Sequence, residues 1–81
     1  MEIEIRLFGA FRKYSEDNPF VRVEFSGPKS IAEIKKHLYQ EIFKNELVFD
    51  SRLATDDTML EEDHLVSASC RLAILPPVSG G

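Results

Sequence analysis

The last six residues of the chain are the ones whose types and order could do chemistry. They read Pro76-Pro77-Val78-Ser79-Gly80-Gly81 and follow an apolar run that ends at Leu75. Proline has no backbone N–H and holds φ near about −65°, so a strand ending at Leu75 cannot continue and the chain leaves it in extended form. Gly80 and Gly81 have no Cβ and fit a channel too narrow for side chains. At about 3.3–3.6 Å per residue this tail reaches about 20 Å, enough to enter another protein's active site.

The carboxylate that Gly81 would present at the end of this tail is not reactive by itself. An α-carboxyl group has a pKa of about 3.3–3.7, so at neutral pH it is an anion and a poor electrophile. The chain has no Gly-rich phosphate loop with which to activate it. Ser79 lies next to the two glycines but has no local base, and we interpret it as a small residue that fits the channel. The sequence therefore predicts a carboxylate that another protein must activate.

Three other groups are weaker candidates for chemistry. Glu61-Glu62-Asp63-His64 has no second His or Cys at ligand spacing and lacks the alternating acids and central Gly of a calcium loop, so we interpret it as a solvated acidic turn. His37 is interpreted as a surface histidine on a helix. The single cysteine, Cys70, has no neighbouring His, Lys or helix start that would lower its pKa, and it cannot form a disulfide within the chain. We predict no metal site and no bound cofactor.

Two segments of the chain resemble a known family. Leu72-Ala73-Ile74-Leu75-Pro76-Pro77-Val78-Ser79-Gly80-Gly81 is similar to the ending of the MoaD-type small subunit of molybdopterin synthase, a ubiquitin-like sulfur carrier. Leu7-Phe8-Gly9-Ala10-Phe11-Arg12 resembles that family's first strand and the turn after it. The chain has Ser69-Cys70-Arg71 where members commonly carry Gly-Asp-Glu, and Ala54-Thr55-Asp56 where they carry Ala-Val-Asn. These departures concern local turns rather than the tail.

This resemblance implies a fold, a reaction and a set of partners. The implied fold is the β-grasp, or ubiquitin-like, fold. A ubiquitin-activating-type adenylyltransferase would use ATP to adenylate Gly81, and sulfur from a donor protein would then displace AMP to leave a thiocarboxylate. The thiocarboxylate would supply the dithiolene sulfurs of the pterin inside the large catalytic subunit, in a heterotetrameric molybdopterin synthase. The small subunit alone would have no activity.

Other functions stay open beside this one. A carrier of the same mechanism could serve thiamine or another sulfur pathway. A ubiquitin-like modifier would instead end in isopeptide bonds with lysines, and a plain binding module would carry the tail incidentally. The run Pro76-Pro77-Val78-Ser79 favours the molybdenum pathway, because modifiers usually carry a longer, basic and flexible tail.

Apolar and polar residues alternate near both ends of the chain, as they do in half-buried strands. The first two strands predicted in this way can pair with each other, and a third closes the domain. Their apolar positions are Ile3, Ile5, Leu7, Val21, Val23, Phe25, Leu72 and Ile74. Between residues 45 and 70, short strands and turns are predicted at Leu47-Val48-Phe49, Leu53-Ala54 and Met59-Leu60.

One helix is predicted with a clear start. Ser30 and Glu33 have the spacing of a capping box, and apolar residues at helical spacing follow to about Phe43 or Lys44. The positions expected to face water are Glu33, Lys35, Lys36 and Gln40. A short helical turn is expected at residues 10–14. The pattern predicts an α+β domain with one main helix on one face of a mixed sheet. The resemblance makes this a β-grasp domain at residues 1–75 with a tail at residues 76–81.

Phe8 and Leu75 are out of phase with the buried positions of their strands. In the β-grasp order those strands are neighbours, so the two side chains would form an exposed apolar patch. We expect Met59 to join it and Arg12 to lie at its rim, as at a surface that docks a partner protein. The alternative is that Phe8 packs beneath the segment from Phe11 to Tyr14 as peripheral core. The resemblance favours docking.

Composition disfavours several other classes of partner. Ten Lys and Arg against fourteen Asp and Glu give a net charge of −4, which repels nucleic acids and anionic membranes. The N-terminus has no basic segment followed by an apolar run, and no stretch approaches membrane-spanning length. A chain of 81 residues forms one domain. We expect a cytoplasmic protein.

Overall fold

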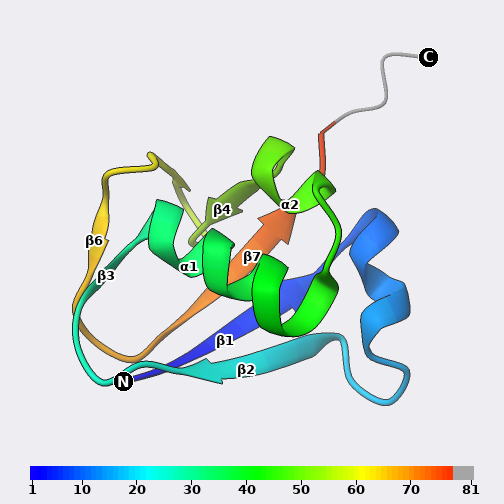
Figure 1. Ribbon diagram of the computed structural model, residues 1–81, viewed down its shortest axis with the longest axis horizontal. Helices are drawn as coiled ribbons and strands as arrows, with labels where there is room; N and C mark the ends of the chain where they lie inside the picture. The colour runs from blue at the N-terminus through cyan, green and yellow to red at the C-terminus, as the bar shows by residue number, and fades with distance from the viewer. Residues whose placement is uncertain (78–81) are drawn as a thin grey trace.

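A five-stranded mixed sheet is the base of the fold in the computed structural model, which describes residues 1–77 (Figure 1). The strands lie in the order β2-β1-β7-β4-β5. Their bounds are β1 Glu2–Leu7, β2 Phe20–Glu24, β4 Arg52–Ala54, β5 Met59–Leu60 and β7 Cys70–Leu75. The two central strands, β1 and β7, run parallel, and the other pairs are antiparallel. The first and last strands of the chain are therefore neighbours, as predicted.

The two central strands direct their apolar side chains to the same face of the sheet. Ile5 pairs with Leu72 and Leu7 with Ile74, and all four side chains are buried. A slip of one residue in this register would turn every one of them to the opposite face. Burial of this row therefore fixes how β7 lies against β1, and with it the place where the tail begins.

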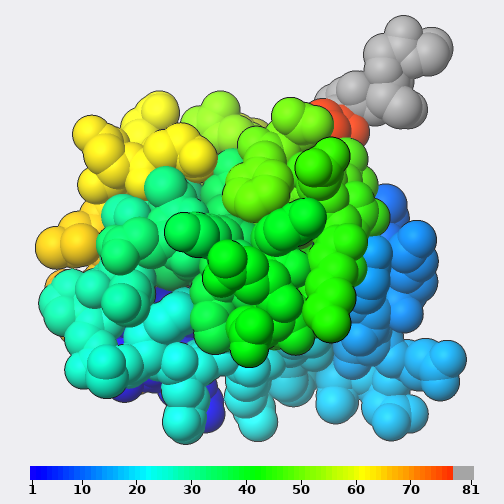
Figure 2. Space-filling view, viewed as in Figure 1, coloured from blue at the N-terminus to red at the C-terminus, as the bar shows by residue number. Residues whose placement is uncertain are grey.

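A helical layer covers that face of the sheet. The α-helix α1 (Ile31–Leu38) continues into a π-helical turn, η2 (Tyr39–Phe43), and ends at Lys44 with a left-handed φ of 50°. Its predicted extent is confirmed. Figure 2 shows the green side chains of this layer hiding most of β1 and β7.

The predicted capping box starts α1. The Ser30 N–H donates to Glu33 Oε1 at 3.0 Å, and the Glu33 N–H donates to Ser30 Oγ at 3.1 Å. These bonds satisfy donors that a helix start would otherwise leave without partners. The Glu33 carboxylate accepts hydrogen bonds from Ser30, and these stabilise its charged form. They lower the pKa of Glu33 below its ordinary value, and the bond from the Ser30 backbone has the largest effect.

Two short helical segments flank the main helix. The 3₁₀ helix η1 (Gly9–Tyr14) matches the predicted helical turn, and its Phe11 is fully buried with its ring 4.9 Å from that of Phe43. The segment α2 (Leu47–Asp50) is helical, so the short strand predicted there is wrong. Asn45 Oδ1 accepts from Leu47 N–H at 2.9 Å, a local side-chain-to-backbone bond that favours a turn over a strand at this point.

A two-stranded sheet lies beside the start of α1. It pairs β3 (Lys29–Ser30) antiparallel with β6 (Leu65–Val66), and the acidic turn at residues 61–64 precedes β6. Two carbonyls of that turn accept from the helix start, Ile31 N–H to His64 O at 3.0 Å and Ala32 N–H to Glu62 O at 3.0 Å. The turn thus has a structural role in capping α1 with its backbone.

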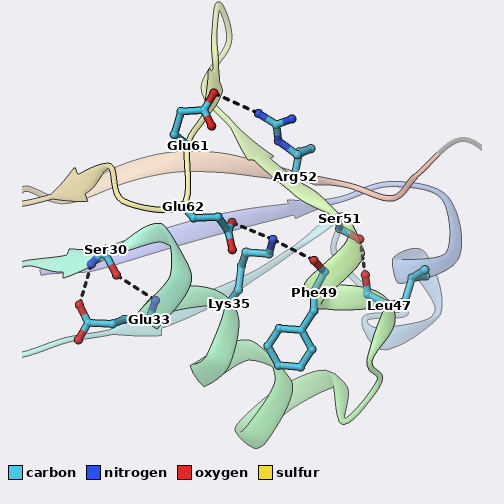
Figure 3. A network of polar contacts seen from close by, with 9 residues as sticks. All are labelled: Ser30, Glu33, Lys35, Leu47, Phe49, Ser51, Arg52, Glu61 and Glu62. Atoms are coloured by element: carbon cyan, nitrogen blue, oxygen red, sulfur yellow. Dashed lines mark hydrogen bonds and ion pairs between the residues drawn. The ribbon is translucent and has the colours of Figure 1, made fainter.

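Lys35 was predicted to face water, and this prediction is wrong, because its side chain is only 3% exposed. Its ammonium donates to Glu62 Oε2 at 3.0 Å and to the Phe49 carbonyl at 3.4 Å (Figure 3). Helical spacing assigned Lys35 to the polar side of α1, but α2 and the acidic turn cover that position. Both partners lie far from Lys35 in sequence, so no local pattern indicates the contact.

The Lys35 contact leads to a prediction about stability. Glu62→Ala is expected to lower the free energy of unfolding by about 1–3 kcal/mol, because the buried ammonium keeps only a long bond to a carbonyl. Glu61→Ala is the matched control, since Glu61 pairs with the exposed Arg52 at 3.7 Å, and such surface pairs contribute about 0–1 kcal/mol. Urea unfolding measures both. Equal effects of the two substitutions would show that Lys35 does not depend on Glu62.

Candidate functional site

The tail begins at the carboxyl end of β7, on the side of the molecule opposite β6 (Figure 1). The strand ends at Leu75, and Pro76 and Pro77 follow it outside any helix or strand. The carboxyl end of β1 lies alongside, because Leu7 pairs with Ile74. The remaining predicted tail residues, Val78, Ser79, Gly80 and Gly81, lie outside the described residues.

The sheet face turned away from α1 carries an apolar strip at this end. Ala73 of β7 pairs with Ala54 of β4, and Ala54 pairs with Met59 of β5, so the three form one row across the sheet. Met59 is 53% exposed, and Ala73 and Leu75 are half-buried. Phe8, directly after β1, is 44% exposed. We call the set of Phe8, Met59, Ala73 and Leu75 the apolar strip.

Of the predicted docking residues, the structure brings Phe8 and Leu75 to the ends of neighbouring strands. Met59 lies two strands from Leu75, across β4, and Arg12 is exposed on η1. Phe8 is 44% exposed, whereas Phe11 packs in the core, so the alternative of a buried Phe8 does not hold. The docking role of these residues stays a prediction.

The other end of the same sheet face is charged. Glu4 of β1 pairs in register with Arg22 of β2 and Arg71 of β7, and its carboxylate contacts both guanidinium groups at 3.7 and 3.0 Å. Glu4 is only 20% exposed, so these ion pairs are partly shielded from solvent. The open face therefore divides into a charged half and an apolar half, and the tail leaves from the apolar half.

Two further arginines border the apolar strip, and the sequence analysis missed them. Arg6 pairs in register with Ala73, and Arg52 pairs with Leu75; both arginines are exposed. Arg6 could have been found by extending the alternation of β1. Arg52 could not, because its place depends on how β4 pairs with β7. Arg52 also contacts the Glu61 carboxylate at 3.7 Å, so of these two arginines it is the one whose charge is partly offset.

Cys70 and His37, the other residues that the sequence singled out, are not part of the apolar strip. Cys70 is exposed on β7, and partial burial of its sulfur raises the pKa of its thiol, so the reactive thiolate is scarce at neutral pH. His37 is half-buried with its ring 4.9 Å from that of Phe25. Within residues 1–77, no group of three or more His, Cys, Asp or Glu is placed to hold a metal ion. Over the same residues, no helix is long and apolar enough to span a membrane.

Comparison with known structures defines the class of fold. The crystal structure of SAMP1 from Haloferax volcanii matches with a TM-score of 0.69 over the whole of both chains, at 19% sequence identity. This likeness shows the β-grasp, ubiquitin-like fold that the sequence predicted. No curated protein sequence matches the chain.

Comparison with protein families is more specific. The ThiS family matches residues 5–81, a range that includes the second half of β1, the apolar strip and the tail. The chain belongs to the ThiS family, whose members are ubiquitin-like sulfur carriers. The predicted superfamily is therefore confirmed, and the pathway that the chain serves is left to proposal.

The apolar strip yields a prediction about docking. For a carrier that works as the resemblance implies, Phe8→Ala is expected to weaken binding to an activating enzyme by about 1–3 kcal/mol, as for an apolar anchor at the centre of an interface. Leu75→Ala should weaken it similarly and also lower stability, because Leu75 is half-buried. Titration calorimetry with the folded variants measures the affinity.

Leu65→Ala is the matched control for Phe8→Ala. Leu65 is an exposed large apolar residue, 58% accessible, and it lies on β6 away from the tail (Figure 1). Its truncation should leave the affinity unchanged. If Phe8→Ala lowered the melting temperature but left the affinity unchanged, Phe8 would belong to the fold and not to the docking surface.

Proposed function

We propose that this chain is the sulfur-carrier subunit of a molybdopterin synthase. It would deliver sulfur, as the thiocarboxylate of Gly81, to the pterin precursor in molybdenum cofactor biosynthesis. The observation that carries the proposal is the Pro-Pro-Val-Ser-Gly-Gly sequence, which follows β7 with no linker at the apolar end of the open sheet face. Membership of the ThiS family supports the carrier chemistry.

The proposed chemistry takes place at Gly81 in successive steps. A carboxylate oxygen attacks the α-phosphate of ATP, which releases pyrophosphate and leaves a mixed anhydride with AMP. A sulfur nucleophile from a donor protein then attacks the carbonyl carbon and expels AMP, which carries away one carboxylate oxygen. When the sulfur nucleophile is a persulfide of the donor, this attack leaves an acyl disulfide; a second thiol attacks the donor sulfur of its S–S bond, forms a disulfide with the donor and releases the thiocarboxylate. The product is about 16 Da heavier than the carboxylate, because sulfur has replaced oxygen.

Three partners follow from this chemistry, and each would act on the tail. A ubiquitin-activating-type adenylyltransferase would bind ATP, a donor protein would supply sulfur, and the large synthase subunit would hold the pterin. The chain itself would bind no cofactor, and its own contribution would be to present the tail and to dock through the apolar strip. We place this work in the cytoplasm, where ATP is available.

The experiment that tests the pathway uses thiocarboxylated chain prepared in advance. Mixed with the large synthase subunit and the pterin precursor in a single turnover, it should lose about 16 Da as the dithiolene forms. Consumption of the thiocarboxylate by the large subunit, with dithiolene in the product, supports the proposal.

A parallel reaction tests the alternative, that the chain supplies sulfur for thiamine. Membership of the ThiS family also fits a carrier that supplies sulfur for thiamine. Thiocarboxylated chain is therefore mixed in parallel with the enzyme that forms the thiazole of thiamine. Turnover there, without turnover by the large synthase subunit, would overturn the molybdopterin assignment and keep the carrier mechanism.

A further inference from the structure

Gly9 and Pro76 are in direct contact where the tail leaves the sheet. Gly9 has a left-handed φ of 55°, and a Cβ added there would lie 2.8 Å from Cγ and 3.8 Å from Cδ of Pro76. Carbon atoms in favourable contact lie about 3.5–4.0 Å apart. The ring of Pro76 therefore occupies the space that any side chain at position 9 would need.

Neither partner in this contact can move aside easily. The pyrrolidine ring fixes φ of Pro76, so the ring and the backbone move together. Gly9 lies two residues after Leu7, which is paired with Ile74, and two residues before Phe11, which is fully buried. A side chain at position 9 would therefore displace the base of the tail rather than a flexible side-chain end.

We propose that Gly9 is a positioning residue for sulfur transfer: its bare Cα seats Pro76 and so sets the direction in which the tail enters a partner's active site. The part of this inference that concerns transfer rests on the proposed carrier function. The part that concerns tail direction rests on the contact alone. A displacement at Pro76 is passed to Pro77, because the ring of each proline restricts its φ. A misplacement of about 1 Å at a reacting group can lower a rate by about a hundredfold.

Two substitutions separate the contact from backbone strain. Asn tolerates the left-handed conformation better than other side chains, so Gly9→Asn adds a Cβ with little strain. Pro76→Ala removes Cγ and Cδ, the atoms within 4 Å of the added Cβ in the described part of the chain. The effect of Gly9→Asn is measured in the wild-type chain and again in the Pro76→Ala background. An effect due to the contact should appear only in the wild-type chain.

Tail direction is measured without any partner. A nitroxide is attached at the base of the tail through Arg52→Cys in a Cys70→Ser background, because Arg52 is exposed and pairs with Leu75. It broadens the amide signals of nearby residues with a steep dependence on distance. Gly9→Asn should change the broadening at Val78 in the wild-type chain, and it should not change it further in the Pro76→Ala background. Unchanged broadening in the wild-type chain would overturn the inference.

Sulfur transfer is then measured in a single turnover with thiocarboxylated chain and the large synthase subunit. Gly9→Asn should slow transfer by at least about tenfold in the wild-type chain and have no further effect in the Pro76→Ala background. Equal slowing in both backgrounds would mean that the contact is not the cause, and would overturn the inference. If the wild-type chain itself transfers no sulfur, the proposed function fails, and the Val78 measurement alone decides whether Gly9 directs the tail.

Discussion

Removal of Gly81 is expected to abolish carrier activity while leaving the domain intact. The shortened chain still ends in a glycine carboxylate, but that carboxylate falls about 3.3–3.6 Å short of its place in the activating enzyme. Adenylation requires the carboxylate and ATP in near-attack geometry, so a shortfall of this size should leave no detectable thiocarboxylate. Intact mass after incubation with ATP, the activating enzyme and a sulfur source gives the result.

A chain with one additional glycine after Gly81 is the matched control for length. It also ends in a glycine carboxylate, and its tail is too long by the same distance. We expect it to react poorly as well, although a bent tail can accommodate an extra residue more easily than a short tail can stretch. Full thiocarboxylation of the shortened chain would show that adenylation does not depend on the length of the tail.

The second large effect is expected for Gly80→Ala, which adds one methyl group to the tail. Under the proposed function, sulfur transfer should fall by about a hundredfold, because the methyl would meet the wall of a partner channel that admits only bare backbone and would displace the terminal carbonyl by about 1 Å. The melting temperature should change little, since replacing a glycine alters unfolded-chain entropy by only about 0.4–1 kcal/mol. Single-turnover transfer from the preformed thiocarboxylate measures the loss.

Gly27→Ala is the control for this substitution within the same chain. Gly27 lies between β2 and β3, and a Cβ added there meets nothing within 4 Å. The same methyl group at this position should leave both stability and transfer near their wild-type values. Undiminished transfer by Gly80→Ala would show that the diglycine is not selected for its small size.

The parts of the fold predicted from sequence are those decided by local pattern. The alternation at Ile3 and Ile5 identified β1, and the spacing of Ser30 and Glu33 gave the start of α1. These signals are reliable because a half-buried strand and a capped amphipathic helix each place specific residue types at fixed intervals. The exposure of Phe8 followed from the same alternation.

The parts that sequence did not predict depend on pairing between distant segments. Lys35 is buried because α2 and the acidic turn meet over it, and neither is near it in sequence. Arg52 borders the apolar strip only because β4 pairs with β7 in one register. The contact between Gly9 and Pro76 likewise joins opposite ends of the chain. Contacts of this kind can be identified only once the tertiary structure is known.

The measurement that tests the carrier function most directly is the intact mass of the wild-type chain. The chain is incubated with ATP, an activating enzyme and a sulfur source, and the modified site is located by fragmentation of its C-terminal peptide. We expect a gain of about 16 Da, located at Gly81 and dependent on ATP. An unchanged mass under conditions in which a known carrier is converted, or a gain located anywhere other than Gly81, would contradict it.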